Sequence, residues 1–132
     1  MSAIDSLLAS ARSRLDRVTP VRARELQEAG ALLVDIRPLA NRRAEGEIPG
    51  AVIVERNHLE WRLDPSSGAR VDAARPGQRW VVICEEGYTS SLAADALNSI
   101  GVPATDVIGG FRAWAAAGLP TCLLCISDAA DE

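Results

Sequence analysis

The sequence predicts an α/β domain built on a mostly parallel sheet, and two observations carry this prediction. Short apolar runs alternate along the chain with segments whose apolar residues recur at helical spacing. The chain has 132 residues, which suits a single domain. Apolar residues make up 48% of it, which is enough for a hydrophobic core and too much for a disordered chain.

The N-terminal segment, residues 1–16, is predicted to be an amphipathic helix that precedes the domain. Its apolar residues recur at helical spacing at Ile4, Leu7, Leu8, Ala11 and Leu15. Thr19 is then a good N-cap and Pro20 suits a first helical turn, so a second helix is expected over residues 21–29. The domain proper is expected to cover residues 17–121.

Four strands and three further helical segments are expected after that helix. The strands are predicted at residues 31–36, 51–54, 80–83 and 104–108. The helical segments are predicted at residues 58–63, from an N-cap at Ser90 or Ser91 through Ile100, and at residues 111–117. Residues 37–47 are expected to form a loop or a broken helix, residues 64–77 a surface connection, and residues 122–132 a short tail.

Composition excludes several classes of function. The net charge of −4 gives no reason to expect nucleic acid as a partner. No run approaches the roughly 20 apolar residues of a membrane span, and the N-terminus lacks the pattern of a secretory signal. Three cysteines do not suggest a disulfide framework, so we expect a cytoplasmic protein in which Cys84 stays a thiol. Nothing calls for a metal or an organic cofactor, and the oligomeric state is left open.

The most informative segment is WVVICEEGYTSSLAADAL, which begins at Trp80. An apolar strand ends at Cys84, and a short loop then leads into an amphipathic helix. Ligands of open α/β sheets bind at the carboxyl ends of strands, and a loop that enters a helix can point several N–H groups at one spot. Such a spot stabilises a thiolate, a persulfide or an oxyanion, and Gly87 permits a positive φ within the turn. Cys84 is therefore the candidate nucleophile.

Four segments resemble, in order, the motifs of the rhodanese-homology family. They are LLVDIR (32–37), GEIPGA (46–51), CEEGYTS (84–90) and GGFRAWAAAGLP (109–120). Together they span about residues 17 to 121. The resemblance implies a five-stranded parallel sheet with helices on both faces, in addition to the N-terminal helix.

The resemblance also implies a chemistry. The Cys84 thiolate would take the outer sulfur of thiosulfate or of a persulfide, hold it as a persulfide, and pass it to a nucleophilic acceptor. The donor and the acceptor would be small molecules or proteins. The loop residues that would surround the sulfur are Glu85, Glu86, Gly87, Tyr88, Thr89 and Ser90. The hydroxyl groups of Thr89 and Ser90 would add hydrogen bonds to it. Asp35 and Arg37 would support the structure.

Three departures from the family pattern affect this interpretation. Glu85 and Glu86 follow the cysteine directly, and their carboxylates are expected to repel a dianion such as thiosulfate and to favour a neutral or basic partner. Glu47 stands where the family usually has histidine. Arg56 follows the second strand, and we expect it to restore positive potential near the sulfur unless Glu55 or Glu60 pairs with it.

Other functions remain open from the sequence alone. A Cys-dependent phosphatase or arsenate reductase would need a loop that ends in an arginine, whereas this loop ends in Thr89, Ser90 and Ser91. A non-catalytic interaction module is the main alternative to a sulfurtransferase. Cys122 and Cys125 form a C-x-x-C pair, which is either a pair of apolar tail residues or a resolving thiol site for Cys84.

Overall fold

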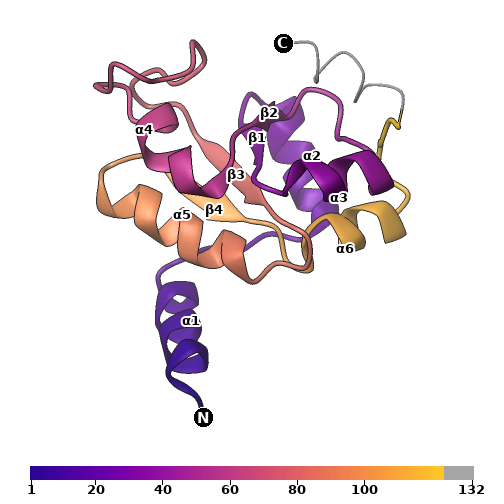
Figure 1. The fold of residues 1–132 in the computed structure, drawn as a ribbon, viewed down its shortest axis with the longest axis horizontal. Coiled ribbons are helices and arrows are strands. Elements are labelled where there is room, and N and C mark those ends of the chain that lie inside the picture. The colour runs from indigo at the N-terminus through magenta and orange to yellow at the C-terminus, as the bar shows by residue number, and fades with distance from the viewer. Residues whose placement is uncertain (124–132) are drawn as a thin grey trace.

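The centre of the molecule is a parallel sheet with the strand order β2-β1-β3-β4 (Figure 1). The computed structural model describes residues 1–123. The strands are β1 (Leu32–Asp35), β2 (Val52–Ile53), β3 (Trp80–Ile83) and β4 (Ala104–Asp106). All three pairings are parallel, and Trp80 of the central strand lies opposite Leu32 on one side and Ala104 on the other. These strands coincide with the four apolar runs of the sequence.

The expectation of a five-stranded sheet was wrong, because the sheet of the described residues has four strands. The place of a fifth strand, beside β4, is taken by a single parallel bridge between Val18 and Val107. The Val18 N–H donates to the Asp106 carbonyl (3.1 Å), and the Val18 carbonyl accepts from the Ile108 N–H (2.8 Å). Helix α2 begins at Pro20, so the chain leaves the sheet edge before it can form a longer strand.

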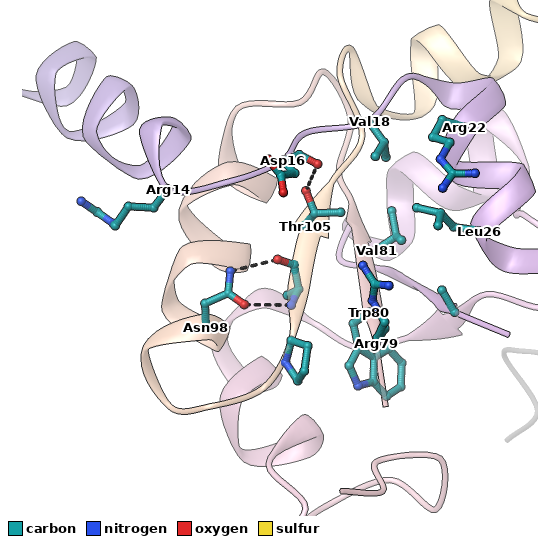
Figure 2. A pocket seen from close by; sticks show the side chains of 13 residues that line it. Arg14, Asp16, Val18, Arg22, Leu26, Arg79, Trp80, Val81, Asn98 and Thr105 are labelled. Atoms are coloured by element: carbon teal, nitrogen blue, oxygen red, sulfur yellow. Dashed lines mark hydrogen bonds between the residues drawn. The ribbon is translucent and has the colours of Figure 1, made fainter. Parts of the chain in front are cut away.

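The rest of the β4 edge is protected by side chains, as Figure 2 shows. The carboxamide of Asn98 takes both outward-facing backbone groups of Ala104, each at 2.9 Å. Thr105 donates its hydroxyl proton to the Asp16 carbonyl (2.8 Å). These contacts line a hollow of about 380 Å³ beside the edge strand. Because Ala104 has no free backbone group, another chain cannot extend the sheet there.

Helices cover both faces of this sheet (Figure 1). They are α1 (Ala3–Ser13), α2 (Pro20–Glu28), α3 (Leu39–Glu45), η1 (Arg56–His58), α4 (Leu59–Leu63), α5 (Thr89–Ser99) and α6 (Gly110–Ala116). The expected loop or broken helix at residues 37–47 therefore contains a short helix, whereas residues 64–77 form a connection without helix or strand. Among the described residues, no helix is long and apolar enough to cross a membrane.

Side chains along β3 point alternately to the two faces of the sheet, so the core has two layers. Trp80 and Val82 pack on one face with residues of α4 and α5, and Val81 and Ile83 pack on the other with residues of α2 and α6. All four side chains are almost completely buried. Burial of each such side chain contributes about 1.5–3 kcal/mol, so the central strand is anchored on both faces. The position of Cys84, directly after this strand, is fixed accordingly.

Helix α1 is the predicted N-terminal helix, and only one end of it rests on the domain. Ser2 caps its N-terminus by accepting from the Asp5 N–H (3.1 Å). Near its C-terminal end, Ala11 is buried and α1 packs on α5. The N-terminal half, with the exposed side chain of Ile4, extends away from the sheet (Figure 1).

Candidate functional site

Cys84 follows β3 at the carboxyl end of the sheet and is only 7% exposed. Its Sγ accepts hydrogen bonds from two backbone N–H groups, those of Gly87 (3.2 Å) and Ser90 (3.3 Å). These donors would stabilise negative charge on the sulfur. The thiol is fixed by these two hydrogen bonds, and because it lines a pocket of about 390 Å³ it is accessible to a small reactant.

Gly87 makes the turn of this loop possible. Its φ is +89°, in a region that other residues rarely adopt. A Cβ at this position would lie 2.8 Å from the Gly109 nitrogen and 3.1 Å from the Val107 carbonyl oxygen. A side chain would therefore both strain the backbone and push the loop away from the start of α6.

The first turn of α6 holds the back of the loop. The N–H groups of Phe111 and Arg112 donate to the carbonyls of Cys84 (2.8 Å) and Glu85 (3.2 Å). Gly110 allows this approach, because a Cβ there would lie 2.6 Å from the Cys84 oxygen. Gly110, the first residue of α6, thus has a direct role in shaping the cysteine loop.

The expectation that Ser90 or Ser91 caps α5 was wrong. The helix begins at Thr89, and both serines are completely buried within its first turn. Their hydroxyls donate to the same oxygen of Asp106, at 2.7 Å and 2.8 Å. Arg17 completes the arrangement with an ion pair to Asp106 (2.9 Å). The Ser90 hydroxyl, expected at the sulfur, is directed to this carboxylate instead, and the Ser90 backbone N–H faces the thiol.

The pocket around the thiol is shaped by three segments at the carboxyl edge of the sheet. Its lining consists of Ile36, Arg37, Pro38, Arg56, Cys84, Glu85, Glu86, Tyr88 and Thr89. Arg56 lines this pocket, but it pairs with Glu60 (2.9 Å), which is the alternative to its expected role near the sulfur. Tyr88 is 59% exposed, so its ring lies at the surface beside the opening.

The two acidic side chains after the cysteine both face Arg112. Its Nε lies 3.1 Å from Glu85 and its Nη1 lies 3.5 Å from Glu86. Burial alone would raise the pKa of Glu85, but hydrogen bonds from Asn41, Glu45 and Arg112 outweigh it, so this pKa lies below its ordinary value. Arg112, which the sequence left unassigned, therefore offsets part of the negative charge of the loop.

Glu45 adds a third carboxyl group to this cluster. Burial raises the pKa of Glu45 above its ordinary value, and its hydrogen bond with Glu85 and the charge of Glu85 raise it further. The Arg37 guanidinium lies beside Glu45, with its Nη1 3.8 Å from the Glu45 carboxylate. The pKa values of Glu45 and Glu85 are therefore shifted in opposite directions by the hydrogen bond between the two groups.

Asp35 and Arg37 form a buried ion pair at the end of β1. The guanidinium contacts both carboxylate oxygens, with the shortest distance at 2.7 Å, and donates to the Gly46 carbonyl (2.8 Å). It also lies 3.7 Å from the centre of the Phe111 ring. This pair connects β1 to α6, the helix that holds the cysteine loop.

Two further arginines reach the loop from the N-terminal segment, and the sequence patterns did not indicate them. The guanidinium groups of Arg12 and Arg17 both donate to the Gly87 carbonyl, at 2.7 Å and 3.0 Å. Arg12 also donates to Ser91 (3.0 Å) and lies 5.6 Å from the ring centre of Tyr88. Contacts between residues so distant in sequence leave no local signal.

The remaining expected features lie away from the thiol. Cys122 bridges Glu47, the residue at the usual histidine position, through two backbone hydrogen bonds (2.8 Å and 3.1 Å). Glu47 is buried and pairs with Arg42. Cys125 lies outside the described residues, so the prediction for the C-x-x-C pair is untested. In residues 1–123, no group of three or more His, Cys, Asp or Glu side chains is arranged to hold a metal ion.

Comparisons with known proteins agree with this architecture. The family model of the rhodanese-like domain matches residues 19–117. A solved protein of unknown function from Rhodopseudomonas palustris, described as a possible tyrosine phosphatase, is 31% identical, with a TM-score of 0.82 over 92% of this chain and 95% of that one. No curated protein matches the chain.

Two further solved structures are similar. A thiosulfate sulfurtransferase from Pseudomonas aeruginosa is 28% identical, with a TM-score of 0.65, over 82% of this chain and 19% of that one. This chain therefore spans about a fifth of that protein. A rhodanese homolog from Thermus thermophilus is 28% identical, with a TM-score of 0.54, over 74% of this chain and 98% of that one.

Proposed function

Because this chain belongs to the rhodanese-like domain family, we propose that it is a sulfurtransferase that carries a sulfane sulfur on Cys84. The observation that supports this most strongly is the pair of N–H donors at the cysteine sulfur, from Gly87 and Ser90. A loop of this kind suits a thiolate and, after transfer, the outer sulfur of a persulfide. We place the reaction in the cytoplasm, where the thiol stays reduced.

The proposed reaction has two displacement steps at sulfur. The Cys84 thiolate attacks the outer sulfur of thiosulfate, a new S–S bond forms, and sulfite leaves with the electron pair of the old bond. With a persulfide donor, the leaving group is a thiolate. A nucleophilic acceptor then attacks the outer sulfur of the Cys84 persulfide, and the cysteine leaves as a thiolate. No oxidant, metal or organic cofactor is required.

The charges around the pocket bear on the choice of donor. Glu85 and Glu86 would repel thiosulfate, but Arg112 lies between their carboxylates. Arg56 and Arg37 line the same pocket. Both donor classes named from the sequence, thiosulfate and persulfides, therefore stay in the proposal.

A phosphatase is the second candidate, because the Rhodopseudomonas palustris relative is described as a possible tyrosine phosphatase. Such an enzyme would need a guanidinium that forks onto the phosphoryl oxygens at the end of the cysteine loop. Thr89 and Ser90 occupy that part of the loop, and Arg112 is engaged by the two glutamates. The loop therefore favours sulfur over phosphoryl transfer.

The decisive experiment loads the purified protein with thiosulfate and, separately, with glutathione persulfide. Intact mass under non-reducing conditions reports the added sulfur, and thiocyanate formation after cyanide addition reports its transfer. Cys84→Ser is the inactive variant, and Cys122→Ser is the matched control for a cysteine outside the pocket. Hydrolysis of p-nitrophenyl phosphate is measured in the same samples.

We expect a gain of one sulfur atom that requires Cys84 and persists in Cys122→Ser, with release as thiocyanate. Loading by glutathione persulfide alone would restrict the donor to persulfides and retain the mechanism. A folded protein that accepts sulfur from neither donor would refute a sulfurtransferase and favour an interaction module. Cys84-dependent phosphate release without sulfur loading would favour the phosphatase.

A further inference from the structure

The N-terminal segment contacts the cysteine loop at one atom, the carbonyl oxygen of Gly87. Arg12, in α1, and Arg17, in the segment that follows it, donate to this oxygen at 2.7 Å and 3.0 Å. Both residues precede the part of the chain that the family model matches, which starts at residue 19. Two guanidinium groups from outside the common domain therefore converge on the loop that carries the thiol.

Gly87 connects these guanidinium groups to the sulfur. Its N–H donates to Cys84 Sγ (3.2 Å), while its carbonyl accepts from both arginines. No peptide bond in the described residues is cis. In a planar trans peptide the C=O and the following N–H point in opposite directions. Because the Gly87 oxygen is turned to the arginines, the N–H of Tyr88 is turned away from them.

Both arginines are held in place by further contacts. Arg17 pairs with the buried Asp106 (2.9 Å), which also accepts from the first turn of α5. Arg12 donates to Ser91 (3.0 Å), and its guanidinium lies 5.6 Å from the ring centre of Tyr88. The two groups are thus fixed at the Gly87 carbonyl. A hydrogen bond from a charged donor is roughly twice as strong as a neutral one, so the Gly87–Tyr88 peptide is firmly oriented.

We propose that Arg12 and Arg17 are positioning residues for the cysteine site. They hold Gly87, whose N–H donates to Cys84 Sγ, by binding its carbonyl oxygen, and their charges polarise the Gly87–Tyr88 peptide. This inference rests on the proposed sulfur transfer for its rate effect, but the effect on the free thiol does not depend on it. The N-terminal helix is then part of the active site and not only an attachment to the domain.

The negative charge of the loop explains why positive groups are needed near Cys84. Two carboxylates follow Cys84 directly, and negative charge beside a thiolate disfavours it. Arg112 compensates these carboxylates on the α6 side, whereas Arg12 and Arg17 act on the α5 side, through the Gly87 carbonyl. Without the N-terminal pair, the loop would lose two positive charges and the anchor of its turn.

The test compares Arg12→Gln with Arg14→Gln in the full chain. Arg14 is the C-cap residue of the same helix and pairs with Asp95 of α5 (2.7 Å), so its replacement removes the same charge and also weakens the docking of α1. Two readouts are taken, the pH dependence of Cys84 alkylation by iodoacetamide and the single-turnover rate of sulfur loading. Urea unfolding shows that each variant is folded. Arg17→Gln is not the primary variant, because it leaves the buried Asp106 without its ion pair.

We expect Arg12→Gln to shift the alkylation profile to higher pH and to slow loading roughly tenfold, while Arg14→Gln stays within about twofold of the unaltered protein. Equal effects of the two substitutions would overturn the proposal, because the role of Arg12 would then be the docking of α1 alone. No effect of Arg12→Gln on either readout would overturn it too. If the unaltered protein loads no sulfur, the proposed function fails, and the alkylation profiles still decide the role of Arg12.

Discussion

Replacement of Arg37 by methionine should destabilise the fold severely, because it leaves a buried carboxylate without its partner. The Arg37 side chain is 0% exposed and that of Asp35 is 1% exposed. The guanidinium makes three contacts of 3.2 Å or less with Asp35 and one of 2.8 Å with the Gly46 carbonyl. Removal of one partner of such a pair costs about 3–5 kcal/mol, a large part of the roughly 5–15 kcal/mol that stabilises a typical domain.

This loss is measurable as a shift of the urea midpoint. With a slope of about 1–3 kcal/mol per molar urea, a loss of about 4 kcal/mol moves the midpoint down by roughly 2 M. Tryptophan fluorescence follows the transition, because Trp80 and Trp114 are buried in the two core layers. The slope itself should stay unchanged, since the substitution leaves the surface exposed on unfolding nearly the same.

A double variant separates the unpaired charge from the loss of packing. Asp35→Asn combined with Arg37→Met has no charge at this site, so it should regain at least about half of the stability lost by Arg37→Met alone. A single variant that loses less than about 1 kcal/mol would refute the assigned role of the pair. A double variant no more stable than the single would show that the loss comes from the arginine's packing on Phe111.

Two further predictions concern the cysteine loop. Gly110→Ala would place a Cβ 2.6 Å from the Cys84 carbonyl oxygen, so it should lower the melting temperature strongly. The control is Gly118→Ala, which also has a positive φ but whose Cβ would meet nothing within 4 Å, and which should lower the melting temperature less. Equal losses would show that the loop moves to accommodate the Gly110→Ala side chain. The lowered pKa of Glu85 means that its ionised form stabilises the fold near neutral pH and that this contribution is lost as the pH falls through its folded-state pKa. The stability of Glu85→Gln should therefore approach that of the unaltered protein below about pH 4, and a pH-independent difference in urea titrations would contradict this.

The sequence predicted the central strand well because WVVI, residues 80–83, is a short, fully apolar run with sharp polar boundaries. The side chains of residues 80–83 are buried in both core layers, so this segment has no polar face that would suggest an amphipathic helix. It also predicted the position of Cys84 at the carboxyl end of that strand, since the loop and helix that follow are local features. The fifth strand was expected from family resemblance alone, and Pro20 shows why it is reduced to one bridge.

The chemistry around the thiol was less predictable, because its contacts join residues far apart in the sequence. The serines at the start of α5 suggested a helix cap, yet a carboxylate from β4, Asp106, draws both hydroxyls into the interior. The engagement of Arg112 by Glu85 likewise depends on the packing of α6 against the loop. Spacing rules describe neighbours within one helix or strand, so they carry no signal for such contacts.

The distribution of charge around Cys84 shows why loop sequence alone is a poor guide to the donor. Glu85 and Glu86 make the loop acidic, and on that basis a dianion would be rejected. Arg12 of α1 and Arg112 of α6 contact this loop, while Arg37, at the end of β1, and Arg56 of η1 line the same pocket. The field at the sulfur is therefore set by tertiary structure, including a helix that the common domain lacks. A relative with an identical loop and no such helix would present a different potential to the same donor, so donor preference should follow these arginines more closely than it follows the loop.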